Sequence, residues 1–280
     1  MSDSALTPFW RAVNTLHAVV YFAPDAKQRY EALGLKGYWM GYFASRGAAL
    51  GTPPADLVTA TFHGFAPSIV ERAIPDAWAR VDRDALLAER AAVAGDALRP
   101  GLEGHDVEAM TTRFAGIAAG LDVAGKPLAA AQRELDAPTD PVQAFWHHLT
   151  VVREFRGDCH IAVLIAAGLG GTAANALQVA VGKAPAEQPA LRGWDEAAWA
   201  AGVDDLRQRG WVDDDGAATD AGLQARDRIE DATDRACAAF MDREATAHAV
   251  SVSDAVRAAA RSVVASGVVA FPNPTGNARP

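Results

Sequence analysis

Apolar residues recur every three or four positions along almost the whole chain, which is the spacing of one face of an α-helix. Strand signals are sparse, and the best is Trp211-Val212 followed by an acidic turn and Ala217-Ala218-Thr219. The fold class is therefore predicted to be mainly α, with short β-hairpin wings at most. Glycine, proline and aspartate bound the expected helices, which cover 8–22, 25–33, 37–49, 54–64, 67–73, 83–98, 105–121, 127–134, 140–167, 171–181, 195–209 and 219–246.

Two stretches of the pattern resemble each other, residues 42–79 and residues 160–200. In each, a helix ends at glycine, a short helix follows, and an acidic residue opens a third helix that carries a tryptophan, Trp78 or Trp199. This predicts two diverged winged-helix-like halves, a pseudo-dimer within one chain. The alternative is chance similarity between alanine-rich helices.

Breaks in the pattern suggest where the halves meet. Gly-Lys-Pro at 125–127 and Ala-Pro-Thr-Asp-Pro at 137–141 form the best linker. We expect an N-terminal half over 8–136, a C-terminal half over 137–250 and a loosely held tail over 265–280, where Gly, Pro and Asn accumulate.

Composition narrows the setting. The chain has 280 residues, half of them hydrophobic, so it can bury a large core. No apolar run approaches the ~18 residues of a membrane span, and residues 1–7 lack the basic cluster of a signal peptide. The cysteines, Cys159 and Cys237, fall inside expected helices, as in a reducing compartment. We therefore expect a cytoplasmic protein without membrane contact.

The segment from Trp194 to Arg228 resembles part of the MarR-type winged-helix regulators. It has a helix, then Arg-Gly-Trp-Val, an acidic turn, Thr-Asp-Ala-Gly and a long helix. Three further motifs stand out, Leu16–Phe22, Gly37–Arg46 and Arg153–His160. Through them the chain resembles, over residues 8–240, an actinobacterial helix-turn-helix-related family without an assigned general activity. Cys159, where that family has glycine, and His63-Gly64, where it has Tyr-Asn, depart from its pattern.

The charge of the expected recognition helix opposes DNA binding. Residues 195–209 carry four acidic side chains against Arg207 and Arg209, and the wing adds Asp213, Asp214 and Asp215. A helix that approaches phosphates normally presents Lys or Arg. The net charge of −9 points the same way. DNA is therefore disfavoured as a partner.

Polar residues inside apolar helices need another explanation. His17 and Tyr21 lie one turn apart on an apolar helix. Arg46 sits in an apolar stretch, where a buried guanidinium requires a carboxylate or an anionic ligand. Arg153, Arg156, Gly157 and His160 form one stripe, which could bind a carboxylate or phosphate beside a proton-transferring histidine. The candidate catalytic residues are His17 and His160, and the candidate ligand-binding residues are Tyr21, Trp39, Arg46, His63, Arg153 and Arg156.

Each candidate also has a purely structural interpretation. His17 can be a core histidine bonded to a backbone carbonyl, and Trp39 can be a packing anchor. Arg153 and Arg156 can pair with Glu154, Asp158 or Asp234 and hold the halves together.

The favoured function is binding of a small molecule between the two halves, with an enzyme of specialised metabolism as one form of it. The alternatives are a ligand-responsive MarR-like regulator and a structural protein without a ligand. No His, Cys, Asp or Glu set has metal-ligand spacing, so no metal site is expected. The sequence does not identify a cofactor, and haem bound by His17, His63 or His160 stays an alternative. Assembly into a homo-oligomer also stays an alternative.

Overall fold

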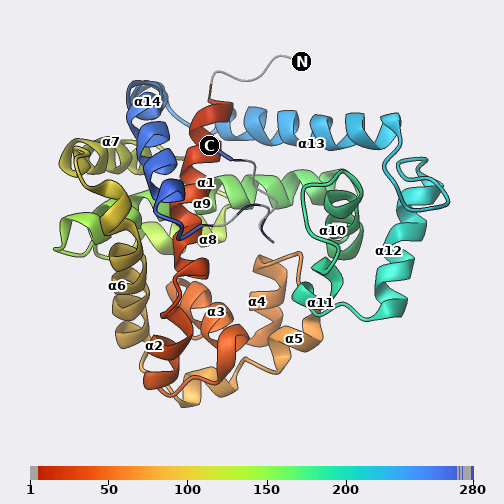
Figure 1. The fold of residues 1–280 in the computed structure, drawn as a ribbon, viewed down its shortest axis with the longest axis horizontal. Helices are drawn as coiled ribbons and strands as arrows, with labels where there is room; N and C mark the ends of the chain where they lie inside the picture. Colours follow the sequence, from red (N-terminus) through yellow and green to blue (C-terminus); the bar gives the residue numbers. More distant parts are fainter. Residues whose placement is uncertain (1–5, 270, 272, 274–278) are drawn as a thin grey trace.

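The computed structural model describes residues 6–269, 271, 273 and 279–280. Within them the fold is mainly α, as predicted, and contains no strand longer than an isolated bridge. Figure 1 shows the α-helices α1 (Thr7–Phe22), α2 (Ala26–Ala32), α3 (Gly37–Gly47), α4 (Ala55–Thr61), α5 (Pro67–Glu71), α6 (Arg83–Leu102), α7 (Val107–Ala119), α8 (Pro127–Arg133), α9 (Pro141–Ala166), α10 (Gly171–Ala180), α11 (Gln188–Arg192), α12 (Glu196–Gln208), α13 (Asp220–Ala239) and α14 (Arg243–Ala265).

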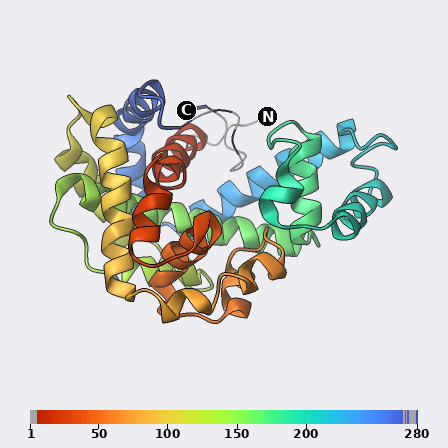
Figure 2. The ribbon, with the colours of Figure 1, turned by 60° about the horizontal axis from the view of Figure 1, so that its bottom comes forward.

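The 26-residue helix α9 is the central element. It starts where the Asp140 carboxylate accepts hydrogen bonds from the backbone N–H groups of Val142 and Gln143 at 3.1 and 3.0 Å. It ends before Gly168, whose φ of +67° is the left-handed conformation that glycine adopts without strain. In the turned view, α9 and α13 run between α6 and α7 at one end and α10–α12 at the other (Figure 2).

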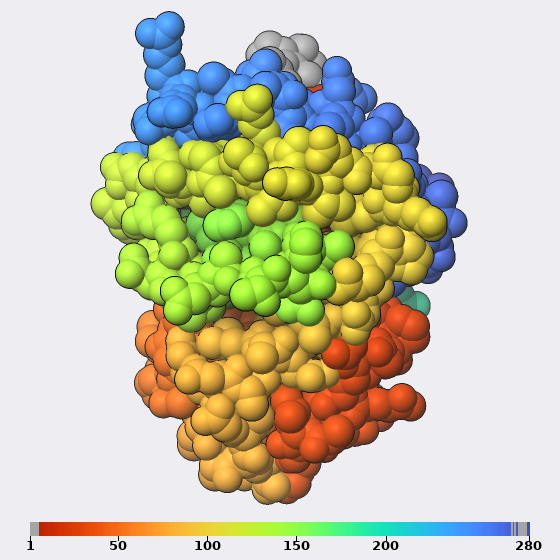
Figure 3. Space-filling view, turned by 90° about the vertical axis from the view of Figure 1, so that its left-hand side faces the viewer, coloured from red at the N-terminus to blue at the C-terminus, as the bar shows by residue number. Residues whose placement is uncertain are grey.

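The helices enclose two hydrophobic cores of unequal size. The larger one is built from α1, α3, α6, α7, α9 and α14, and its fully buried aromatic side chains include Phe9, Phe43, Phe114 and Phe145. The smaller one joins the end of α9 to α10, α12 and the turn after α12. Figure 3 shows the side of the larger core, where the yellow-to-green part of the chain, α6 to α8, lies between α13 and α14 above and the red and orange N-terminal segments below.

The C-terminal helices differ from the prediction. A single helix over 219–246 was expected, but α13 ends at Ala239, and Asp242 caps a new helix by accepting a hydrogen bond from Ala245 N at 2.7 Å. Helix α14 then extends to Ala265 and packs on α1, α6 and α7. Its buried face is made of alanine and valine at three- and four-residue spacing, a helical pattern that the prediction did not extend beyond residue 246. The short α11 was also missed.

The two similar stretches diverge in structure. Trp199 lies in α12, as expected, whereas Trp78 lies in a single 3-10 turn, Asp76–Ala79, instead of a third helix. The expected wing is reduced to one antiparallel bridge between Val212 and Ala218. The duplication and the division into 8–136 and 137–250 stay predictions. Much of the expected tail, at 270, 272 and 274–278, lies outside the described residues.

In the described part of the chain, no single helix has the length and apolar character to cross a bilayer. Only α9 and α10 taken together, bent by 100°, meet that test.

Candidate functional site

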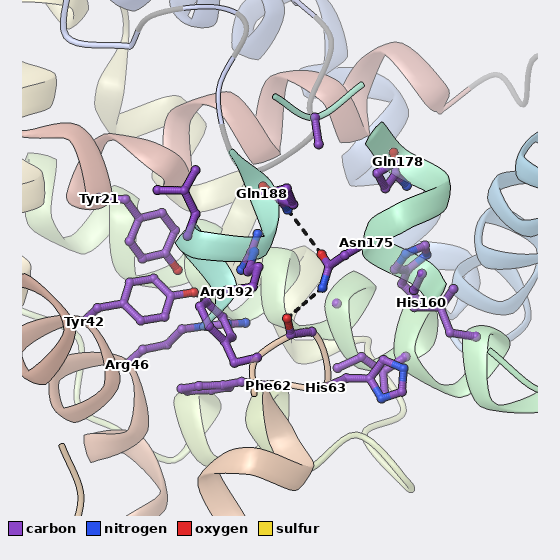
Figure 4. A pocket seen from close by; sticks show the side chains of 18 of the residues that line it. Tyr21, Tyr42, Arg46, Phe62, His63, His160, Asn175, Gln178, Gln188 and Arg192 are labelled. Atoms are coloured by element: carbon purple, nitrogen blue, oxygen red, sulfur yellow. Dashed lines mark hydrogen bonds between the residues drawn. The ribbon is translucent and has the colours of Figure 1, made fainter. Parts of the chain in front are cut away.

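A cavity of about 590 Å³ lies between the N-terminal helices and the α10–α13 end of the molecule. Its walls come from the end of α1, from α3, from the turn after α4, and from α9, α10, α11 and α13. In the close-up, Tyr21, Tyr42 and Arg46 lie on one side, and Gln178, His160 and His63 lie on the other (Figure 4). The size suits a small organic molecule.

A buried ion pair joins α3 to α9 on the tyrosine side. Arg46 Nε donates to Glu154 Oε1 at 3.0 Å, and Nη2 donates to Oε2 at 2.8 Å, so the pair is bidentate. Arg46 Nη1 also donates to the Tyr42 hydroxyl at 3.3 Å, and the guanidinium carbon lies 4.3 Å from the centre of the Phe62 ring. Four contacts therefore fix the Arg46 side chain at the cavity wall.

Glu154 serves a second guanidinium as well. Arg153 Nη1 donates to Glu154 Oε2, so one carboxylate faces two guanidiniums. Burial alone would raise the pKa of Glu154, but Arg153 and Arg46 outweigh burial and hold that pKa well below its usual range. The carboxylate is ionised, and the cluster of Arg46, Arg153 and Glu154 carries one net positive charge.

His17 and Tyr21 lie beside this cluster. The centres of their rings are 5.4 Å apart, so the predicted shared face of α1 is confirmed. His17 stacks on Trp146 and its Nε2 atom lies 4.0 Å from Glu154 Oε1. Burial, and then Arg153, lowers the pKa of His17 well below its ordinary value, so the imidazole is neutral. Neither His17 Nε2 nor the Tyr21 hydroxyl has a hydrogen-bond partner among the described residues.

The opposite side of the cavity is built by amides. Asn175 Nδ2 donates to Gly64 O at 2.7 Å, and Asn175 Oδ1 accepts from Gln188 Nε2 at 3.2 Å, which ties α10 and α11 to the turn after α4. Gln178 Oε1, one turn along α10, is buried without a hydrogen-bond partner in the described part of the chain. Gly171 lets α10 come this close, because a Cβ there would lie 2.2 Å from His63 O.

The histidines of this side are held as neutral groups or donors. His63 Nε2 lies 3.1 Å from Leu169 O, a carbonyl that can only accept, so Nε2 carries the proton. His160 Nδ1 is 3.0 Å from Thr233 Oγ1, and burial lowers the pKa of His160 to about 4. His160 is therefore neutral near pH 7 and could accept a proton.

Six of the eight predicted site residues line the cavity, namely Tyr21, Trp39, Arg46, His63, Arg153 and His160. His17 lies behind its wall. Arg156 does not line the cavity and pairs with Glu230 at 3.0 Å and Asp234 at 2.9 Å. Asp234 is one of the partners expected in the structural interpretation, but the link joins α9 to α13 inside the predicted C-terminal half and does not join the two halves. Arg46 and Arg153 have both roles, since each pairs with Glu154 and lines the cavity.

Several lining residues escaped the sequence analysis. Arg192 lies in the short α11 that the pattern did not predict, with its guanidinium carbon 4.4 Å from the centre of the Phe65 ring. Burial lowers the pKa of Arg192. Asn175 and Gln178 look like ordinary surface positions of an amphipathic helix, and only the fold turns them inward. Glu154 had a readable signal, because it is an acid in the same apolar surroundings that singled out Arg46.

The expected recognition helix uses its arginines internally. Arg209 on the chain after α12 donates to the carbonyls of Ala167 and Gly168 at 3.0 and 2.8 Å, which caps the end of α9. Arg207 pairs with Asp204 at 2.7 Å and donates to Asp214 O at 3.0 Å.

Two further features bear on chemistry. Among the described residues, no group of three or more His, Cys, Asp or Glu side chains is placed to hold a metal ion. Cys159 and Cys237 are free and buried, in α9 and α13, as their positions in expected helices suggested.

The fold and the site together define a mainly α protein with an arginine-lined cavity. The chain belongs to a helix-turn-helix family, whose pattern matches residues 6–270. No curated protein and no solved structure matches it.

Proposed function

We propose that this protein binds a small molecule in the cavity between its N-terminal helices and the α10–α13 end. The observation that carries the proposal is the set of buried polar atoms at the wall without a hydrogen-bond partner in the described chain: Tyr21 OH, Gln178 Oε1 and Arg226 Nε. A buried polar atom left unpaired costs about 1–3 kcal/mol. Three of them around one cavity favour an occupant that completes their hydrogen bonds.

Turnover of that occupant is the stronger form of the proposal. His160 lines the cavity and burial keeps its imidazole neutral, so the ring can accept a hydrogen bond from the ligand. Because its lowered pKa makes it a weak base, proton transfer to His160 requires a ligand whose binding raises that pKa. In this scheme His160 acts directly on the ligand. His17 lies behind the wall, with its ring 5.4 Å from that of Tyr21, and positions the Tyr21 ring.

Gly157 offers a direct test. A Cβ at Gly157 would meet Glu154 Oε2 at 3.4 Å and Arg153 Nη1 at 3.5 Å, which are ordinary contacts, so Gly157→Leu should fill the cavity without breaking α9. Gly170→Leu is the matched control, since a Cβ at this exposed glycine meets nothing within 4 Å. Native mass spectrometry and visible absorption of the purified chain, followed by a thermal-shift screen of small molecules, would compare the three proteins.

We expect bound or stabilising compounds with the wild type and with Gly170→Leu, and their loss with Gly157→Leu. Compounds that bind all three proteins equally would place the ligand elsewhere. Failure to find any compound that binds the wild type would contradict the proposal.

A ligand-responsive DNA-binding regulator is the second candidate, favoured by membership of a helix-turn-helix family. The intramolecular contacts of Arg207 and Arg209 and the acidic run Asp213–Asp215 count against it. An electrophoretic shift with sheared DNA at low salt tests it, because phosphate contacts strengthen as salt falls. Retention at nanomolar protein would favour the regulator.

A further inference from the structure

The charges at the cavity wall are all of one sign. Four guanidiniums line it, those of Arg46, Arg153, Arg192 and Arg226. No aspartate or glutamate is among the described lining residues. This occurs in a chain whose net charge is −9. Low-dielectric walls with charges of one sign concentrate the field inside a cleft, so this cavity attracts anions although the whole protein repels them.

The acids that pair with three of these arginines, Arg46, Arg153 and Arg226, lie behind the wall. Glu154 is fully buried beneath Arg46 and Arg153, and Glu230 lies 3.6 Å from Arg226. At Glu154 the balance is incomplete, because one carboxylate meets two guanidiniums and the adjacent His17 is neutral. The Tyr21 hydroxyl beside this cluster is an additional donor that no described group uses.

The remaining wall next to the cluster is aromatic. The rings of Trp39 and Tyr42 lie 5.7 Å apart, and both stand within 6 Å of the Phe65 ring, at 5.6 and 5.4 Å. Phe62 closes the same side beneath Arg46. An apolar or aromatic ligand body would bury surface there, while its charged end meets the guanidiniums.

We propose that the ligand is a small organic acid whose oxyanion sits at Arg46 and Arg153, within reach of the Tyr21 hydroxyl, and whose apolar body lies against Trp39, Tyr42 and Phe65. This inference rests on the proposed function and names the chemical class of the ligand. Arg46 uses its paired N–H groups on Glu154 and contributes mainly its charge, whereas Arg153 donates to Glu154 through Nη1 and can turn its other N–H groups toward an oxyanion. Carboxylate and phosphate share this chemistry, and the competitors described below distinguish them.

Two fluorescent probes with the same aromatic skeleton test the inference. 8-Anilinonaphthalene-1-sulfonate carries an oxyanion, and N-phenyl-1-naphthylamine lacks it. We expect the sulfonate probe to bind the full chain about tenfold more tightly than the neutral probe, since charge-assisted hydrogen bonds are about that strong. Arg153→Gln should remove the preference and leave the neutral probe unchanged, because Arg46 and Glu154 then balance one to one. Arg153→Lys should restore part of the preference.

The controls separate this inference from the proposed function. Arg257→Gln changes an arginine of α14 outside the cavity and should alter neither probe. Equal affinity for both probes, lost together in Gly157→Leu, would overturn the organic-acid assignment and leave cavity binding in place. Probes that bind Gly157→Leu as well as the wild type would overturn both.

Displacement assays complete the test and do not depend on any variant folding. 1-Naphthoate and 1-naphthyl phosphate should each displace the sulfonate probe from the wild type, and the tighter of the two identifies the carboxylate or the phosphate as the better head group. Displacement by 1-naphthol to the same extent as by both acids would overturn the inference.

Discussion

The cavity wall and the surface around α12 present opposite charges: the cavity wall is positive and the surface around α12 is negative. At the cavity, guanidiniums form the wall and their carboxylates lie behind them, with Glu154 fully buried. Around α12 the arrangement is reversed, because Arg207 and Arg209 turn back onto carbonyls of their own chain while the acidic turn Asp213–Asp215 is exposed. This arrangement is the observation that counts against the DNA-binding regulator, the second candidate function.

This contrast also separates two energetic roles of arginine. When a buried guanidinium is removed from its carboxylate, the carboxylate stays in the interior as an uncompensated charge, which strongly destabilises the fold. A guanidinium at the surface loses little, because water replaces its contacts. The following predictions use this difference.

The largest effect is expected at the buried pair. Arg46→Ala should lower the free energy of unfolding by about 3–5 kcal/mol, because Glu154 is left in the interior with Arg153 as its remaining counter-charge. Urea denaturation followed by circular dichroism measures the loss. The double variant Arg46→Met, Glu154→Leu removes both buried charges and should recover most of the stability. A loss below about 1 kcal/mol in the single variant would show that the pair is not structurally required.

The next effect depends on pH. Burial lowers the pKa of His160 to about 4, whereas an unfolded chain has a histidine pKa near 6.5, so between these values the unfolded state binds more protons. Stability is therefore full above about pH 6.5 and falls as the pH drops toward 4, by about 2–3 kcal/mol for this one side chain.

Urea midpoints at pH 7, 5.5 and 4.5 would measure this dependence, and His160→Gln should make it shallower. His147, whose pKa burial also lowers to about 4, lies away from the cavity and serves as a comparison. A His160→Gln profile parallel to that of the wild type would mean that His160 does not titrate in this range.

A smaller effect on the free energy of unfolding, of opposite sign, is expected at Gly157 in the cavity wall. Gly157→Ala should raise the free energy of unfolding by about 0.5–1 kcal/mol, because alanine favours helix over glycine and the new Cβ meets only ordinary contacts. Gly171→Ala is the contrasting variant and should destabilise, because its Cβ would overlap the His63 carbonyl oxygen. Calorimetric melting of the two proteins compares them. If both variants destabilise, the space at Gly157 is smaller than the structure indicates.

The smallest effect is expected near α12. Arg207→Ala should change the free energy of unfolding by about 0.5 kcal/mol or less, since its ion pair with Asp204 is exposed. The same urea experiment measures this change. A loss comparable to that of Arg46→Ala would remove the distinction between the two regions.

Much of the fold could be predicted because apolar residues recur at three- and four-residue spacing in most helices. The buried residues of α14, which include Ala245, Ala249, Val252 and Val256, have the same spacing, so the sequence carried a readable signal for this helix. It was missed because the prediction ran one helix over 219–246, across the Asp242 cap, and assigned no helix to the residues that follow. In the stretch 42–79 a third helix was expected to open at an acidic residue near Trp78, but only the 3-10 turn Asp76–Ala79 forms there. Local similarity to the Trp199 segment could not reveal that difference.

Only part of the candidate site could be predicted from the spacing of residues in the sequence. Tyr21, Arg46, Arg153 and His160 were found because each breaks an apolar helical face. Arg156 lies on the same stripe but pairs with two carboxylates on α13, Glu230 and Asp234. These partners lie 74 and 78 positions further along the chain, so local spacing could not reveal them. Arg192 and the amides of α10 could not be assigned, because only tertiary packing turns them toward the cavity.

The grip of Arg209 on the last carbonyls of α9 has a mechanical consequence. The same helix supplies Arg153, Gly157 and His160 to the cavity. The hydrogen bonds of Arg209 therefore connect the C-terminal end of α9 to the C-terminal end of α12. If a ligand displaces α9, α12 and the acidic turn are displaced with it, and a spin label on the turn would detect that the cavity has been filled.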